Sequence, residues 1–194
     1  LVFNSFDSKV GWINGKRKGM AYGIQSWQLY TQDSSGKIEK TTHKKMEFML
    51  PTMQYFMELP YRMLNAPIIS YMGTEEMNGE EYELVFVSWD SAEPNEHDQY
   101  VLYINKQTSL LERATYTIRD NFMWMPKSFY GTAVYRNFEN INGIIIPMQM
   151  DVFMMDKINS KPVHTFSIKK VIFNSFEKYE LYPFKDLPEM GDAK

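Results

Sequence analysis

The sequence consists of short apolar runs separated by turn-forming residues at fairly even intervals, and this spacing constrains the fold more than any other feature. The segments EEMNGEEY and FENINGIII each contain Asn-Gly, which favours tight hairpins because both positions tolerate positive φ. Short runs joined by such turns are typical of antiparallel all-β proteins. We expect strands at about Lys9–Ile13, Met20–Thr31, Lys37–Lys40, Ile69–Thr74, Glu80–Trp89, Gln99–Asn105, Leu110–Arg119, Gly131–Glu139, Ile144–Met155 and Val163–Phe173.

One interval, from Thr42 to Leu59, follows a different pattern, because its apolar residues recur at steps of three or four. This period predicts an amphipathic helix, whose start Thr41 or Thr42 can cap. Pro51 lies inside it and predicts a kink or a division into two shorter helices. The apolar stripe consists of Met46, Met49, Leu50, Met53, Phe56 and Met57.

Two interpretations of this stripe stay open. Apolar helical stripes are normally core, here packed on a sheet. The sequence also has 15 Met residues, and the flexible Met side chain suits a cavity that adapts to a ligand. Both interpretations of the stripe hold if the helix lies against a sheet that is too large for the helix to cover.

A second apolar cluster lies between two expected strands, in the segment RDNFMWMPKSFYG. Connections are usually polar and exposed, so these large side chains either pack into a compact loop or cover an opening. The chain then ends in YPFKDLPEMGDAK, a charged, Pro-containing tail that is expected to fray.

Composition excludes several classes of function. The 194 residues fit one domain, residues 1–194, and a net charge of −3 gives no basic field for nucleic acid. Without Cys there is no thiolate metal site or Cys nucleophile, and no apolar run approaches the ~20 residues that span a bilayer. No catalytic motif is present, so we expect a non-enzymatic protein with no catalytic residue, cofactor or metal.

The best polar cluster is AEPNEHDQY, in which His97 neighbours three carboxylates, but it lacks a metal-loop pattern and we interpret it as a solvated loop. The sequence opens on LVFNSF without an initiator Met, which favours a trimmed N-terminus and leaves any targeting signal out of view.

The strand at Gln99–Asn105 raises the question of what covers it, because it is apolar on both sides. Tyr100, Leu102 and Ile104 alternate with Val101 and Tyr103, whereas a strand with one wet face should alternate with polar residues. Either more protein or a bound ligand covers the second side.

Three stretches of the sequence resemble the LolA/LolB-like lipoprotein-carrier superfold. They are ISYMGTEEMNGEEYELVFVSW, DQYVLYINKQTSLLERATYTIRD and NINGIIIPMQMDVFMMD. The resemblance covers roughly Leu59 to Phe173 and is closest to envelope proteins of Gram-negative bacteria. It implies an antiparallel half-barrel of about ten to eleven strands wrapped around a kinked helical plug at about 42–59. The carriers also use an arginine in the cavity, and Arg113 and Arg119 lie in the corresponding part of the chain.

The resemblance further implies export to the periplasm or outer membrane, often with a lipid anchor upstream of residue 1, through which the protein would associate with a membrane surface. We therefore expect a monomeric envelope protein that binds a hydrophobic ligand, such as a lipid, an acyl chain or a lipoprotein, inside the half-barrel. The alternative is a structural module, or one that binds a protein or glycan, with a cavity filled by its own side chains. The candidate ligand contacts are Met46, Met53, Phe56, Met57, Phe122, Trp124 and Met125.

Overall fold

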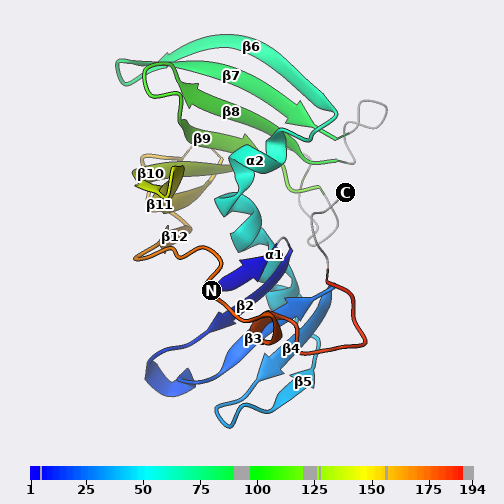
Figure 1. Ribbon diagram of the computed structural model, residues 1–194. Coiled ribbons are helices and arrows are strands. Elements are labelled where there is room, and N and C mark those ends of the chain that lie inside the picture. Colours follow the sequence, from blue (N-terminus) through cyan, green and yellow to red (C-terminus); the bar gives the residue numbers. More distant parts are fainter. Residues whose placement is uncertain (5, 90–96, 120–125, 127, 156, 190–194) are drawn as a thin grey trace. The chain divides into compact units, whose positions relative to one another are not determined.

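The computed structural model describes residues 1–4, 6–89, 97–119, 126, 128–155 and 157–189. The chain divides into two compact units, Leu1–Leu59 with Ile172–Lys194, and Pro60–Val171. The first contains a five-stranded antiparallel sheet and the second a seven-stranded one, so the fold is mainly β as predicted (Figure 1). The single sheet of ten or eleven strands is corrected to two, because the helical interval separates two meanders whose strands do not pair with each other among the described residues. The single domain stays a prediction.

The first unit is a meander in which each strand pairs with the next along the chain. The basic segment GKRKG, between Gly15 and Gly19, contains a short exposed 3-10 helix, η1, at Gly15–Arg17. The predicted strand Met20–Thr31 is in fact two strands joined by a tight turn, and a short strand at the N-terminus was not predicted. The strands are β1 (Val2–Asn4), β2 (Asp7–Gly11), β3 (Ala21–Gln25), β4 (Gln28–Gln32) and β5 (Ile38–Lys40).

The turn between β3 and β4 escaped prediction because it uses Ser26 and Trp27 where Asn-Gly would be usual. Both residues have positive φ, 49° and 63°, a conformation that costs free energy for residues with side chains. The fully buried carboxylate of Asp7 accepts a hydrogen bond from the Ser26 N–H at 2.7 Å. A contact 19 residues away therefore supports a turn that its own residues disfavour.

We expect Asp7→Ala to lower the free energy of unfolding by about 2 kcal/mol, the typical cost of losing a buried hydrogen bond to a charged group. Asp7→Asn keeps an acceptor oxygen for the Ser26 N–H and should cost less than half as much. Urea denaturation of the three proteins measures both effects. Equal losses for the two variants would show that the charge of Asp7, and not its bond to the turn, is what matters.

Helix α1 (Lys44–Met57) occupies the predicted helical interval and packs on β2 and β3. Its N-cap is His43, which replaces the predicted threonine, and the His43 N–H donates to the Glu47 carboxylate at 3.1 Å. The helix runs through Pro51 and ends only at Met57, so the predicted division at Pro51 is not observed. On the sheet side, Leu50 forms a buried cluster with Ile24 and Leu29, and Met46 packs against that cluster, together with Val10 and Tyr22.

The C-terminal segment returns to the first unit, where the prediction of a frayed tail is wrong for residues 182–189. A one-turn helix, α3 (Lys178–Leu181), places the fully buried Leu181 in the core. The Tyr30 hydroxyl donates to the Leu181 carbonyl at 3.2 Å, and the Tyr30 ring meets Phe184 edge-on at 5.5 Å. Contacts with the distant N-terminal sheet therefore order a segment whose composition favours disorder.

The second unit begins with the short helix α2 (Leu59–Met63), whose first residue still belongs to the first unit, and continues as a seven-stranded meander. Both Asn-Gly hairpins are confirmed, with Asn78–Gly79 and Asn142–Gly143 at positive φ. The last strand is shorter than predicted. The strands are β6 (Ile68–Met77), β7 (Glu80–Ser88), β8 (Gln99–Asn105), β9 (Leu111–Tyr116), β10 (Gly131–Ile141), β11 (Ile144–Met154) and β12 (His164–Ser167). Among the described helices, none has the length and apolar character needed to cross a membrane.

Candidate functional site

The register of the second sheet sorts its side chains into two faces, because residues directly opposite each other in antiparallel strands point to the same side. We call the side that carries Tyr100 and Leu102 the Tyr100 face and the side that carries Tyr103 the Tyr103 face. On the Tyr100 face, side chains in register form a row across six strands. All members of this row are apolar except a tyrosine at one end. Its members, in register, are Tyr71, Val85, Leu102, Ala114, Ala133 and Val152.

The next row of the Tyr100 face is aromatic at its centre. Tyr100 stacks on Tyr116 at 6.1 Å and meets Trp89 edge-on at 5.6 Å. The Tyr116 ring lies over Gly131, where a Cβ would come within 2.5 Å of the ring. Burial, with a smaller contribution from Asp98, raises the pKa of Tyr116, so its hydroxyl stays protonated and the face carries no charge here.

The Tyr100 face is covered unevenly. Ala114 and Ala133 at its centre are fully buried, whereas Ile69 and Tyr71 on β6 are 51% and 64% exposed. In register, these two side chains lie beside Val87 and Val85 of β7. An apolar surface therefore continues from the buried centre of the sheet to an open end at β6.

The Tyr103 face holds a partly buried polar network. The Tyr82 hydroxyl bonds to the carboxylates of Glu80 and Glu112 at 2.8 and 2.9 Å, and Asn105 also donates to Glu80 at 3.0 Å. Burial, followed by these two carboxylates, raises the pKa of Tyr82. On this face, Val101 and Tyr103 of the strand Gln99–Asn105 are half-buried. The second side of the strand is therefore partly covered as well, which explains why it is apolar on both sides.

Arg113, one of the two arginines suggested by the resemblance, lies on the Tyr103 face opposite Tyr103. Its guanidinium stacks over the Tyr103 ring at 4.6 Å and lies 3.3 Å from the sulfur of Met77. Arg119 follows β9, and its backbone N–H donates to the Asp98 carboxylate at 2.6 Å. Arg113 therefore lies on the other side of the sheet from the apolar row, because successive residues point to opposite faces.

The seven ligand contacts predicted from the sequence fall into two groups. Met46, Met53, Phe56 and Met57 all lie on α1, where Phe56 is buried, the three Met residues are half-buried and Met46 contacts the core of the first unit. Phe122, Trp124 and Met125 lie outside the described residues. All seven stay predictions as ligand contacts.

Sequence analysis missed the open end of the Tyr100 face as a candidate. The signal was available in the alternation of Ile69 and Tyr71 with Ser70, but an exposed end looks the same in sequence as a buried one. Within the residues that the structure describes, no group of His, Asp and Glu side chains could hold a metal ion. The carboxylates Glu93 and Glu96 next to His97 lie outside the described residues.

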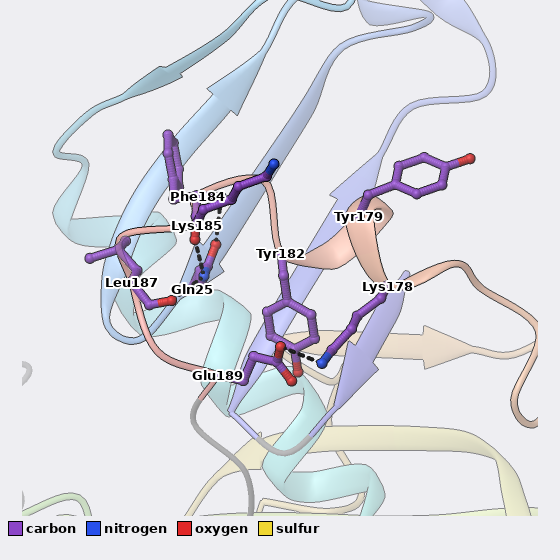
Figure 2. A pocket seen from close by; sticks show the side chains of 8 residues that line it. All are labelled: Gln25, Lys178, Tyr179, Tyr182, Phe184, Lys185, Leu187 and Glu189. Carbon is purple, nitrogen blue, oxygen red and sulfur yellow. Dashed lines mark hydrogen bonds and ion pairs between the residues drawn. The ribbon is translucent and has the colours of Figure 1, made fainter.

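The first unit has a pocket of about 300 Å³ beside the docked C-terminal segment (Figure 2). Gln25, which is buried, forms its floor, and its side-chain amide bonds to the backbone of Phe184 and Leu187. Lys178 at the rim pairs with Glu189 at 2.7 Å, and this hydrogen-bonded pair raises the pKa of Lys178. The remaining lining residues are Tyr179, Tyr182 and Lys185.

Four of the polar side chains that line this pocket already have partners in the chain. The Tyr182 hydroxyl accepts a hydrogen bond from Asn4 at 2.8 Å, and burial is the main cause that raises its pKa. With the amide of Gln25 and the Lys178–Glu189 pair also engaged, the pocket has a structural role in docking the C-terminal segment, and we do not take it as the ligand site.

Comparison with solved structures finds similar folds at low sequence identity. A DUF1329 family protein from Desulfovibrio piger is 12% identical, with a TM-score of 0.49 over 90% of this chain and 76% of that chain. A LolA superfamily protein from Nitrosomonas europaea is 14% identical, with a TM-score of 0.46 over 92% and 79%. A candidate outer membrane lipoprotein-sorting protein domain from Vibrio parahaemolyticus is 9% identical, with a TM-score of 0.48 over 90% and 77%.

Two of these structures carry names of the superfold that the sequence motifs resemble, namely the LolA superfamily protein and the lipoprotein-sorting domain. No family model matches the sequence, and no curated protein matches it. Because every TM-score lies below 0.5, these likenesses assign neither a site nor a function to this chain.

Proposed function

We propose that this protein is a non-enzymatic cell-envelope protein that binds a hydrophobic ligand, namely a lipid, an acyl chain or a lipoprotein, on the Tyr100 face of its seven-stranded sheet. The proposal assigns no catalytic residue and no cofactor. It includes the finer expectations from the sequence, which are a sheet curved as an open half-barrel, a helical plug, export to the periplasm or outer membrane, and a monomeric state.

The observation that carries the proposal is the uncovered end of the Tyr100 face. Ile69 and Tyr71 expose more than half of their surface while their register neighbours Val87 and Val85 continue the same apolar surface inward. Covering exposed apolar surface is favourable by about 25 cal/mol per Å². A chain of methylene groups laid along this surface gains about 0.8 kcal/mol for each group that it buries, and no catalytic group is needed.

The Met-lined side of α1 and the segment that holds Phe122, Trp124 and Met125 remain candidate contacts under this proposal. They are flexible or large apolar side chains, which adapt to an acyl chain without specific hydrogen bonds. The contribution of the second segment to ligand binding can be tested with the double variant Trp124→Ala, Met125→Ala, which should bind a fluorescent fatty acid more weakly.

A second candidate function has an observation of its own. Ala114 and Ala133, at the centre of the Tyr100 face, have no exposed surface, so protein already covers that part of the sheet. This favours a structural or interaction module whose interior is filled by its own side chains and whose exposed aromatic residues bind a protein or a glycan.

Native mass spectrometry of the freshly purified protein separates the two candidates, because it detects bound lipid and oligomeric state together. Titration with a dansyl fatty acid then locates the site. We expect Ile69→Ser with Tyr71→Ser to weaken binding about tenfold, since each side chain loses contact with roughly one methylene group. The control is Ile172→Ser with Tyr179→Ser, the same chemical change at exposed positions of the first unit.

Co-purified lipid, together with weaker binding only in the β6 variant, would support the proposal. Absence of both lipid and probe binding would favour the self-filled module. Equal affinity in both double variants would remove the β6 end from the site.

A further inference from the structure

The outer edge of β6 is the longest unpaired strand edge among the described residues. β6 has 10 residues and pairs on one side only, with β7 (Figure 1). The other strands at the ends of the two sheets are β1 and β5, with 3 residues each, and β12, with 4. Short edges are the usual protection against pairing with another chain, and β6 lacks this protection.

The side chains of β6 divide the edge into an apolar half and an acidic half. Ile69, Tyr71 and Met72 are 51%, 64% and 54% exposed. After a bulge at Met72, the strand continues to Glu75 and Glu76, which are both exposed. Among the described residues, neither glutamate forms an ion pair. An extended segment on this edge would therefore find apolar contacts along one half and negative charge along the other.

The acidic half is part of a larger negative region. Glu80, Glu81 and Glu83 on β7 are also exposed, and the ion pair that neutralises part of this charge joins Lys106 to Glu81 at 2.8 Å. Like charges repel at short range, so a second copy of this acidic edge is a poor partner. Lysine or arginine in the partner would instead be attracted, and the attraction would fall as salt rises.

A bulge lies between the two halves of the edge. Gly73 in this bulge, with φ of 100°, has no atom within 4 Å of the place where a Cβ would lie, so the strand is uncovered on that side. All strand pairs in this sheet are antiparallel. An added antiparallel strand would place its N-terminal part opposite Glu75 and Glu76 and its C-terminal part opposite Ile69 and Tyr71.

We propose that β6 binds an extended segment of a partner protein as an additional antiparallel strand, with basic residues in the N-terminal part of the segment and apolar residues in its C-terminal part. Backbone hydrogen bonds supply the affinity, as in other cases of strand addition, and the two halves of the edge supply register and direction. This interaction goes beyond the proposed lipid binding, because its affinity comes from the backbone groups along the edge of β6, although it shares Ile69 and Tyr71 with the proposed lipid site.

The test uses the full chain and a fluorescein-labelled peptide, Lys-Lys-Thr-Val-Thr-Val-Thr-Val-Ser-Trp, with fluorescence anisotropy as the readout. We expect Glu75→Lys with Glu76→Lys to weaken binding about tenfold, the effect of two exposed charge pairs. The control is Glu139→Lys with Glu177→Lys, which changes the net charge equally at exposed positions outside β6 and β7, and its affinity should stay within about twofold of the parent's. A peptide with its two lysines moved to the C-terminus should bind more weakly than the parent peptide.

N-methylation of the peptide distinguishes strand addition from adsorption on a face. In a strand, alternate N–H groups point to the same edge. Methylating one alternating set should therefore abolish binding, while methylating the other set should preserve it. Equal behaviour of the two methylated peptides, or no binding of the parent peptide, would overturn the proposal.

Two further readouts keep this inference separate from the proposed function. The variant with Glu75→Lys and Glu76→Lys keeps Ile69 and Tyr71, so its affinity for the dansyl fatty acid should not change. Analytical ultracentrifugation tests self-association. If the protein forms a dimer, and the variant with Glu75→Lys and Glu76→Lys forms it more strongly or not at all, then a second copy of the chain occupies the edge and the proposal is overturned.

Discussion

Gly23→Ala is expected to lower the free energy of unfolding by about 3 kcal/mol, near the upper end of the usual cost of overpacking. Gly23 lies directly opposite Tyr30 in the β3–β4 pair, and the Tyr30 ring occupies the space where a Cβ would be. The ring cannot move aside cheaply, because it is fully buried and its hydroxyl is bonded to the Leu181 carbonyl. The clash outweighs the gain of about 0.4–1 kcal/mol that alanine brings by restricting the unfolded chain.

Gly11→Ala is the matched control in the same sheet. Its Cβ would meet the Met20 carbonyl oxygen at 3.6 Å and the Ala21 Cβ at 3.7 Å, which are ordinary contacts. We expect its unfolding free energy to change by less than about 0.5 kcal/mol, as for most substitutions without a clash. Urea denaturation of both variants measures the difference. Equal stability of the two would mean that the Tyr30 ring does not lie over Gly23.

Gln25→Leu is expected to have an effect of similar size, about 3 kcal/mol, through lost hydrogen bonds. The buried Gln25 amide donates to the carbonyls of Phe184 and Leu187 at 2.8 and 3.1 Å and accepts from the Phe184 N–H at 3.1 Å. A leucine side chain leaves all three backbone groups without this partner. We therefore expect the segment around Phe184 to detach, with faster amide exchange at that residue and faster tryptic cleavage after Lys185.

Two further variants separate hydrogen bonding from packing at this position. Gln25→Glu keeps the shape of the side chain but replaces its donor by an acceptor that faces two carbonyl oxygens, so it should also release the segment at neutral pH. Gln107→Leu, at an exposed turn of the second unit, should leave stability and cleavage unchanged. If Gln25→Glu protected the segment as well as the parent does, packing and not hydrogen bonding would hold the C-terminus.

Features set by neighbouring residues were predicted correctly from the sequence. Asn78–Gly79 and Asn142–Gly143 form the two predicted hairpin turns, because each turn depends on the φ preference of its own residues. The alternation of Tyr100 and Leu102 with Val101 and Tyr103 also predicted which side chains share a face, because the strand period is fixed at two.

Features that depend on distant contacts were predicted incorrectly or not at all. The Ser26–Trp27 turn is not a favourable turn sequence, and it is supported by Asp7. The C-terminal segment looks disordered in sequence but is bound by Gln25, 159 residues away from Phe184. The exposure of Ile69 and Tyr71 follows from the position of β6 at the end of the sheet, which no local pattern encodes.

By itself, the sequence determined that the chain is mainly antiparallel β with one Met-lined helix, since periodicity and turn chemistry act over a few residues. Only the tertiary structure decided that the strands form two sheets, that Arg113 lies on the polar side of the second sheet, and that an apolar surface stays open at β6. The physical reason is that strand order and burial arise from contacts between segments far apart in the chain, whose partners a local pattern does not specify.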